Sequence, residues 1–472
     1  MRQILRLPTP LLLLLLATYS LSAQTLDWSA VQQQVLEYHP LAKQSGLLRE
    51  QAAAMLLRAR GGFDPKAFGA YSNKNFNGKN YFQYVETGVK LPTWAGLEIK
   101  SAYNYAAGDF LNAESKLPKN GQATIGFDWS LGQGLLFDER RAGLQMARIS
   151  LEMSESERRA LLNDLLLESA KTYWDWVLAQ QSLQITEDAL LQAKIRHNGL
   201  TESFRQGDKP AIDTLESFIQ VQSRTLDLQF TRTEAQNAAI ALTVFLWNAD
   251  NQIMTPEQLP AVPAIMLMNT GVEAALEVDN LVQQAQLRHP EIQLYQAKLR
   301  QLATERRLKN EKRKPVVNLS YYLLGNGWSF FPSASARGVE VLANDIKWGL
   351  DVSYPLLNRK ARGDYQLTQI KLAQTELELQ LKIQGVESKV RQYANDLQNL
   401  RAQVTLFRDM TDNFRRLLAA ENEKFLQGES SIFLINTREQ RWLDTQLKLL
   451  KLLTTLQKTE AGLKWAVGVL AY

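Results

Sequence analysis

Two segments at matching points of the two halves of the chain alternate between apolar and small or charged residues. They cover residues 123–131 and 346–354. Alternation with a period of two is typical of a β-strand whose two faces meet different surroundings. Each segment therefore predicts a strand with one apolar face, formed by Ile125, Phe127, Trp129 and Leu131 in the first and by Ile346, Trp348, Leu350, Val352 and Tyr354 in the second.

A long tract without proline follows each predicted strand, over about residues 138–206 and 358–426. Of the 14 prolines, none falls between Pro118 and Pro210 and none follows Pro355. Proline breaks or kinks a helix interior, so both tracts can form uninterrupted helices. At about 1.5 Å per residue, each helix would reach on the order of 100 Å. No single globular domain is that wide, so we expect the helices to form a rod.

Both tracts carry the three-four spacing of apolar residues that is typical of a coiled coil. The second tract shows it at Val390, Tyr393, Leu397, Leu400, Val404 and Phe407, and again at Phe414 and Leu417. The first tract shows it at Leu162, Leu166, Tyr173, Trp176, Leu183 and Leu190. We therefore expect the aromatic segment at residues 173–176 to lie in a helix core rather than in a binding pocket.

The chain contains an internal repeat, which organises everything else. Tyr38-His39-Pro40 matches Arg288-His289-Pro290 at an offset of 250 residues. Farther along, Phe204-Arg205-Gln206-Gly207 matches Phe425-Leu426-Gln427-Gly428 at an offset of 221. The offset falls between these points, which means that the first half has extra residues in its strand region. Each half predicts a helix, strands, a long helix, a turn and a second helix.

The division of the chain follows from this repeat. Residues 1–23 have the pattern of a secretory signal peptide, with Arg2 and Arg6 before an apolar run and small residues up to Ala23. The first repeat then covers residues 24–250, a proline-containing connection covers 251–275, and the second repeat covers 276–472.

Strands and their neighbours can be placed within each repeat. In the first, residues 26–60 should be helical, 66–71 and 124–131 should be strands, and 85–91 with 97–105 should form a hairpin around the turn 92–96. In the second, the predicted strands are 317–323 and 346–354. The repeated His-Pro should mark a helix bend or boundary. Whether the extra hairpin joins the other strands stays open at this point.

Composition excludes several classes of function. The formal charge of +5 does not suggest nucleic-acid binding, and the absence of cysteine removes disulfides, thiolate metal sites and thiol nucleophiles. The three histidines, His39, His197 and His289, show no ligand spacing with acidic residues, so we expect no metal, no cofactor and no enzyme activity. After the signal peptide no stretch approaches 18 consecutive apolar residues, so a membrane-inserted form would have to be a barrel.

In its order of elements, the chain resembles the TolC-like outer-membrane efflux protein family. The resemblance covers nearly all of the mature sequence: the signal peptide, the twofold repeat, barrel-type strands, and a glycine-containing helix turn in each half. It implies a mainly α protein with a membrane β-barrel portion, in which a long coiled-coil helical tunnel joins a barrel shared by a homotrimer. Four strands from each chain would then make a twelve-stranded barrel. Four to six strands cannot close a membrane barrel alone, so several chains are needed in any case.

The resemblance also implies a function and a location. The protein would be a passive exit duct for efflux or secretion in the outer membrane of a Gram-negative-type bacterium, with its helices in the periplasm. It would work with a periplasmic adaptor protein and an inner-membrane transporter. The exported substrate leaves no readable mark on the sequence.

Candidate site residues follow from the strand pattern and from the family. Phe127, Trp129, Trp348 and Tyr354 are candidates for the lipid-facing surface and its aromatic girdles, and Asp128, Lys347 and Asp351 for the lumen. The helix turns would lie at the periplasmic end of the tunnel, and their candidate adaptor-contact residues are Phe204, Gly207, Asp208, Phe425, Gly428 and Glu429.

An acidic pair is the candidate constriction at that end. The family often carries two aspartates three residues apart after the second-half turn, but this chain has Leu434 and Thr437 there and carries Asp213 and Glu216 in the first half. Carboxylates three apart share one helix face, so three copies could form a cation-favouring ring. Alternatively, both residues only suit the positive end of the helix after Pro210.

Two other classes of protein remain as alternatives. A secreted or surface coiled-coil scaffold would insert into no membrane, but it would not be expected to present an apolar face on its strands in both halves. A general diffusion porin is nearly all strand, whereas this chain is mostly helix.

Overall fold

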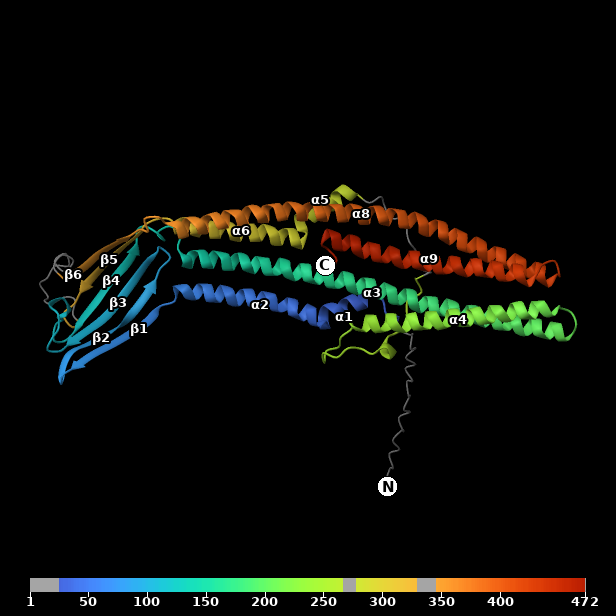
Figure 1. Ribbon diagram of the computed structural model, residues 1–472, viewed down its shortest axis with the longest axis horizontal. Helices are drawn as coiled ribbons and strands as arrows, with labels where there is room; N and C mark the ends of the chain where they lie inside the picture. The colour runs from blue at the N-terminus through green and yellow to red at the C-terminus, as the bar shows by residue number, and fades with distance from the viewer. Residues whose placement is uncertain (1–24, 266–276, 329–344, 472) are drawn as a thin grey trace, which may run out of the picture. The chain divides into compact units, whose positions relative to one another are not determined.

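The computed structural model describes residues 25–265, 277–328 and 345–471 (Figure 1). The first half contains α1 (Trp28–Tyr38), α2 (Pro40–Arg60), β1 (Lys66–Phe76), β2 (Lys79–Pro92), β3 (Leu97–Ala107), β4 (Gln122–Ser130), α3 (Glu139–Arg205) and α4 (Ala211–Thr243). The second half contains α5 (Val278–Arg288), α6 (Pro290–Glu311), β5 (Val316–Leu324), β6 (Ile346–Ser353), α8 (Arg359–Leu426) and α9 (Ile432–Val467). Short 3-10 helices lie at Gly61–Phe63, Ala113–Ser115 and Pro256–Gln258.

Both halves have the same order of helices. The long helices α3 and α8 have 67 and 68 residues, and α4 and α9, which follow the turns, have 33 and 36. The two proline-free tracts are therefore confirmed as continuous helices. The predicted signal peptide lies outside the described residues, as do residues 266–275 of the predicted connection.

The His-Pro repeat is confirmed as a helix boundary. The helix expected over residues 26–60 is divided there into α1 and α2, and α5 and α6 are divided in the same way. His39 and His289 both have an extended backbone, with ψ of 134° and 125°. The residue before proline avoids the helical region because the proline ring collides with its backbone, so the helix must end there.

Within the described residues, six strands lie in one antiparallel sheet, in the order β1-β2-β3-β4-β5-β6. The predicted hairpin forms β2 and β3, and β2 pairs with β1 on one side and β3 on the other. The two halves of the chain meet where β4 pairs with β5, from Thr124 opposite Leu324 to Ser130 opposite Asn318. The predicted hairpin therefore joins the other strands, and the sheet formed by the described part of the chain has six strands where the family pattern implied four.

The chain forms two compact units. One contains the sheet and covers Pro40–Glu168, Glu273–Asn399 and Thr459–Tyr472, and we call it the sheet unit. The other covers Met1–His39, Ser169–Val272 and Leu400–Lys458, and we call it the turn unit because it contains both turns between long helices. Each unit takes segments from both halves of the chain.

Aromatic side chains fill the core of the turn unit, as expected for residues 173–176. Tyr173, Trp174 and Trp176 are all buried. The ring of Trp28 on α1 lies 5.7 Å from that of Tyr173, whose hydroxyl donates a hydrogen bond of 2.7 Å to the carbonyl oxygen of Leu26. This segment therefore fixes the start of α1 to α3.

In the sheet unit, the end of α9 is held to α3 by a buried asparagine. The Asn163 side chain donates to the carbonyl oxygen of Trp465 at 2.9 Å and accepts from the backbone N–H of Leu470 at 3.2 Å. Both polar ends of this buried amide are thus satisfied, as a packed interior requires. The Trp465 ring also packs against Tyr393 and Lys389 on α8.

Gly126 is a position where the sheet tolerates no side chain. A Cβ atom there would overlap the carbonyl oxygen of Tyr321 and lie 2.6 Å from the Cα of Tyr322 on the neighbouring strand. Gly126→Ala should therefore force β4 and β5 apart and cost about 1–3 kcal/mol. Thermal unfolding followed by tryptophan fluorescence measures the loss. Gly69→Ala on β1 is the matched control, because the nearest atom to its Cβ would be 4.0 Å away. Equal melting temperatures for the two variants would contradict this account.

Candidate functional site

The pairing register gives the sheet two chemically different faces. Residues directly opposite each other on neighbouring strands point to the same face. Ile99 lies opposite Phe127, Phe127 opposite Tyr321, and Tyr321 opposite Trp348. A second row runs from Leu97 through Trp129 to Leu319 and Leu350. The apolar residues of β3 to β6 therefore form one continuous surface, which we call the apolar face.

Much of the apolar face is uncovered. Trp348 is 65% exposed, Val352 62% and Leu350 56%, while Trp129 lies at 36%. Tyr354, just beyond β6, is 49% exposed. Exposed apolar patches that extend over several strands are rare on monomeric water-soluble proteins and mark contact with a membrane or a partner.

Polar residues occupy the opposite face of the same strands. Asp128, Lys347 and Asp351 alternate with the apolar residues and lie on this polar face. The Tyr322 hydroxyl donates to Asp128 Oδ2 at 2.6 Å, and Lys100 Nζ forms an ion pair of 2.8 Å with Glu86. The polar side chains are therefore linked across strands, as expected for a sheet face in contact with water.

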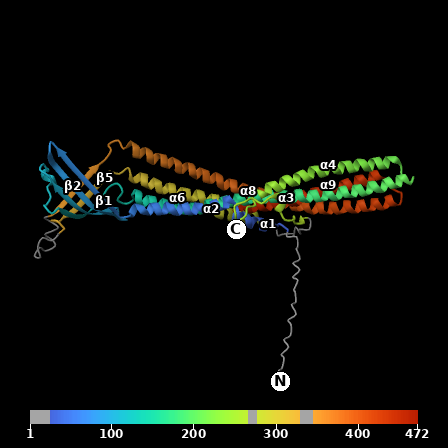
Figure 2. The ribbon, with the colours of Figure 1, turned by 90° about the horizontal axis from the view of Figure 1, so that it is seen from below.

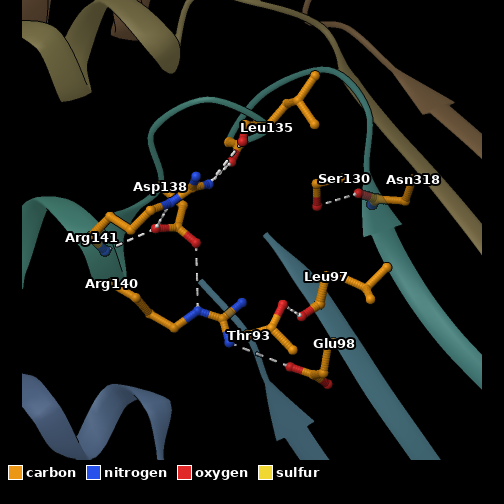
Figure 3. A network of polar contacts seen from close by, with 10 residues as sticks. Thr93, Leu97, Glu98, Ser130, Leu135, Asp138, Arg140, Arg141 and Asn318 are labelled. Atoms are coloured by element: carbon orange, nitrogen blue, oxygen red, sulfur yellow. Dashed lines mark hydrogen bonds and ion pairs between the residues drawn. The ribbon is translucent and has the colours of Figure 1, made fainter. Parts of the chain in front are cut away.

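A compact polar network joins the sheet to the start of α3 (Figure 3). Asp138 Oδ1 accepts from the backbone N–H of Arg141 at 2.8 Å and from its Nε at 3.1 Å. Arg141 Nη2 in turn donates to the carbonyl oxygens of Gly134 at 2.6 Å and Leu135 at 2.9 Å. Arg140 lies 3.6 Å from both Asp138 and Glu98 on β3.

Asp138 therefore caps the first turn of α3 and closes the connecting loop by way of Arg141. A carboxylate at this position satisfies free backbone N–H groups and suits the positive end of the helix. The contact with Glu98 extends the network to the β2–β3 hairpin, whose turn is closed by Thr93 and Leu97. The function of this network is to fix the direction in which α3 leaves the sheet.

The two helix turns at the other ends of the long helices have the same construction. In the first, the N–H of Gly207 bonds to Phe204 O and that of Asp208 bonds to Ser203 O. In the second, the N–H groups of Gly428 and Glu429 bond to Phe425 O and Lys424 O. Gly207 and Gly428 have φ of 85° and 79°, a conformation that glycine adopts without strain.

The turns also contact each other in the turn unit. Lys209 Nζ lies 4.5 Å above the ring of Phe425. Phe204 and Leu426 are exposed, and so are Asp208 and Glu429. This end of the helices offers exposed apolar and acidic side chains together.

The structure places the acidic pair in different surroundings. Asp213 lies in the first turn of α4 and is half-buried. Glu216 accepts a hydrogen bond of 3.3 Å from Asn436 on α9. Glu216 is thus hydrogen-bonded within its own chain, to a side chain of α9.

A buried ion pair, not predicted from the sequence, lies beside Glu216. Arg196 on α3 makes a two-pronged contact with Glu439 on α9, at 2.8 and 3.0 Å, and also donates to Asn436 at 3.1 Å. The Glu439 side chain is only 6% exposed. One signal was available: Glu439 falls in the apolar spacing of α9, between the buried residues Ile435 and Leu443. A charge in such a row requires a partner.

Other kinds of site find no support within the described ranges. There, no group of three or more His, Asp or Glu residues could hold a metal ion. The histidines serve separately, since His39 packs on Phe245, His197 lies 2.9 Å from Ser217 Oγ, and His289 caps α6. In the part of the chain that the structure describes, we find no helix with the length and apolar character needed to cross a membrane.

No protein-family model matches the sequence, and no curated protein matches it either. Solved structures do match over nearly the whole chain. The CmeC outer membrane channel of Campylobacter jejuni is 15% identical, with a TM-score of 0.67, and the match covers 94% of this chain and 86% of that one. The chain has the fold of the TolC-like outer-membrane channels.

Two further outer-membrane proteins of known structure give the same picture. The outer membrane protein VceC of Vibrio cholerae is 14% identical, with a TM-score of 0.63 and coverage of 93% of this chain and 96% of that one. The open state of the MtrE outer membrane channel of Neisseria gonorrhoeae is 13% identical, with a TM-score of 0.64 and coverage of 94% and 89%. The expected TolC-like fold of helices and barrel-type sheet is thus confirmed. In a single chain the sheet is open, with β1 and β6 as its edges.

Proposed function

We propose that this protein is an outer-membrane channel, a passive exit duct for efflux or secretion. The observation that carries the proposal is the sheet, which has one exposed apolar face and one linked polar face over the same strands. A water-filled pore in lipid requires such a wall. The TolC-like fold supports the same conclusion, and a coiled-coil scaffold would leave the apolar face unexplained.

The two faces of the sheet can then be assigned, one to lipid and the other to the lumen of the pore. Phe127, Trp129, Trp348 and Tyr354 would face lipid, and Asp128, Lys347 and Asp351 would face water. Backbone groups at an open sheet edge cannot stay unpaired in hydrocarbon, so several copies must complete the barrel. We take the number as three, by analogy with the fold.

The chain would supply a path and no chemical energy. Its helices would extend into the periplasm of a Gram-negative-type bacterium, and an inner-membrane transporter would drive export through a periplasmic adaptor. The adaptor would contact the two helix turns through Phe204, Gly207, Asp208, Phe425, Gly428 and Glu429. The Lys209–Phe425 contact supports treating the two turns as one surface.

Single-channel conductance in a planar bilayer tests the proposal, with wild type compared with Asp213→Ala/Glu216→Ala. We expect discrete conductance steps from the purified protein, and a severalfold loss of cation selectivity in the double variant, because three copies would lose six carboxylates at the constriction. Asp250→Ala/Glu257→Ala is the matched control. It removes the same charge from exposed positions in the connection after α4 and should leave selectivity unchanged.

The other outcomes separate the parts of the proposal. Conductance steps with unchanged cation selectivity would support the channel and reject the constriction. Asp213 and Glu216 would then only stabilise the positive end of α4. Protein that is folded and helical but never inserts into the bilayer would favour the scaffold.

A further inference from the structure

The hairpin of β1 and β2 has the dimensions of the strands around it. β1 has 11 residues and β2 has 14, whereas β4, β5 and β6 have 9, 9 and 8. A tilted strand needs about 9–11 residues to cross a bilayer. β2 pairs with β3 from Gln83 opposite Ala107 to Pro92 opposite Glu98, so the hairpin is joined along most of its length.

The polar face is packed continuously from β1 to β3. The ring of Phe68 on β1 covers Gly88 on β2, where a Cβ atom would come within 2.9 Å of the ring. Lys90 Nζ and Lys100 Nζ lie 5.2 and 5.0 Å from the centre of the same ring, on β2 and β3. An aromatic ring over a strand glycine is a known way to stabilise a curved sheet.

The same device occurs between β4 and β5. There the ring of Tyr322 covers Gly126, with 2.6 Å from the ring to the position of a Cβ atom. The hairpin of β1 and β2 is therefore built into the wall in the same way as the strands that meet at the centre of the sheet.

The apolar face also continues onto the hairpin. Leu91 on β2 lies opposite Ile99, and Val89 lies opposite Ser101 on β3. Val89 and Leu91 are 47% and 41% exposed, and Tyr71 on β1, which lies opposite Val85 on β2, is 64% exposed. A hairpin folded away from lipid would have no need of this face.

Among the strands that the structure describes, β1 and β6 alone have a free edge. β3 is paired on both sides, with β2 and with β4. Five successive antiparallel pairings make β1 and β6 run in opposite directions. The two free edges can thus pair with each other in the antiparallel manner that membrane barrels use.

Helices next to the same two edges expose apolar residues. α8 follows β6 and exposes Leu367, Ile370, Leu377 and Leu381 at helical spacing, the last 76% exposed. α2 precedes β1 and exposes Leu47, Met55 and Leu57. Within the sheet unit, α8 and α2 are the outermost of the helices that join the sheet in Figure 1, and Figure 2 again shows α8 at the outside. The apolar row on α8 and the exposed apolar residues of α2 fit a second copy of this chain.

We propose that all six strands of each chain enter one closed barrel, and that the β6 edge of one copy pairs with the β1 edge of the next. A trimer then encloses eighteen strands. This inference rests on the proposed channel function and changes its dimensions, because barrel diameter grows roughly linearly with strand number. The pore through the membrane is roughly one and a half times as wide as that of a twelve-stranded barrel.

Disulfide cross-linking tests the seam, and the absence of cysteine from the chain makes each introduced pair unique. Because the register between copies is open, Ala67→Cys, Gly69→Cys and Tyr71→Cys on β1 are each combined with Trp348→Cys or Leu350→Cys on β6. All five positions lie on the apolar face, and opposed residues of the closer, non-hydrogen-bonded pairs approach the Cβ separation that a disulfide needs. After mild oxidation we expect at least one pair to give covalent dimers and trimers that dithiothreitol reverses.

The competing arrangement is a twelve-stranded barrel from which β1 and β2 are excluded. It would pair β6 with β3, so Ile99→Cys with Trp348→Cys would cross-link between copies. Within one chain these two residues are three strands apart and cannot be bridged. Cross-links of this kind, or the absence of every β1–β6 cross-link, would overturn the proposal.

Electron cryo-microscopy of the wild-type assembly gives an independent count. Eighteen strands in the barrel are expected, and twelve would overturn the inference. Conductance of the same preparation separates the two proposals. Channel steps with a twelve-stranded barrel would refute the strand count alone, whereas a folded protein without steps would refute the channel.

Discussion

Replacing Glu439 with alanine should lower the free energy of unfolding by about 3 kcal/mol, because it leaves the Arg196 guanidinium without its partner among buried side chains. The two side chains are 6% and 19% exposed, and both nitrogens of the guanidinium fork bond to the carboxylate, at 2.8 and 3.0 Å. Such paired, charge-assisted bonds are about twice as strong as neutral ones. Denaturant titration followed by circular dichroism gives the loss, and hydrogen exchange should place it in the first half of α9.

Glu202→Ala is the matched control on α3. It removes the partner of Arg205 in an ion pair of 3.4 Å whose side chains are 57% and 71% exposed. Exposed pairs contribute at most about 1 kcal/mol, so the effect should be small. The double variant Arg196→Met/Glu439→Leu should recover most of the loss, because apolar residues of similar size can replace a buried pair. Equal losses from Glu439→Ala and Glu202→Ala would contradict the assignment.

The helices were predictable because their signals are local and long. Two proline-free tracts with apolar three-four spacing became α3 and α8, with ends within one residue of Glu139–Arg205 and Arg359–Leu426. The two His-Pro boundaries were predictable for the same reason, since the proline restricts the residue before it. The alternation of apolar and polar residues likewise predicted the positions of the six described strands.

Strand membership of one sheet was not predictable from the sequence. Pairing between Gln83 and Ala107, or between Phe127 and Tyr321, depends on contacts across the fold, which alternation along one strand does not record. The strand number implied by the family pattern was wrong, because the pattern implied four strands per chain and the sheet of the described residues has six. The glycines at positions 88 and 126 acquire their meaning only beside Phe68 and Tyr322.

In the candidate site, too, local features were predictable from the sequence and contacts between distant residues were not. Gly207 and Gly428 could be predicted as helix turns, since each follows a long helix and repeats the same four-residue pattern. The ion pair between Arg196 and Glu439 joins residues 243 positions apart, and only the misplaced charge in the apolar row of α9 hinted at it. The lipid, lumen and adaptor roles remain proposals that rest on position.

Acid should destabilise the sheet unit because of His289, which the structure keeps neutral. This side chain is 4% exposed, and burial lowers its pKa from 6.5 to about 4. Nearby Lys382 and Lys389 act in the same direction, and Glu291 opposes them. Between about pH 6.5 and 4, the unfolded chain binds a proton that the folded chain does not bind, so stability falls as the pH falls. The full effect is roughly 3 kcal/mol per chain.

The variant His289→Asn isolates this effect. His289 Nδ1 accepts the backbone N–H of Glu291 at 3.3 Å and so caps α6, and the asparagine side-chain oxygen can accept the same bond without titrating. Free energies of unfolding measured from pH 7.5 to 4 should therefore depend much less steeply on pH in the variant.

Part of this pH dependence should remain, because burial also lowers the pKa of His39. Glu155, whose pKa is held at about 2 by Arg158 and Arg159, loses its stabilising charge only below about pH 4.5 and so falls largely outside this window. An unchanged slope in His289→Asn would show that His289 is not the group that makes the fold acid-sensitive.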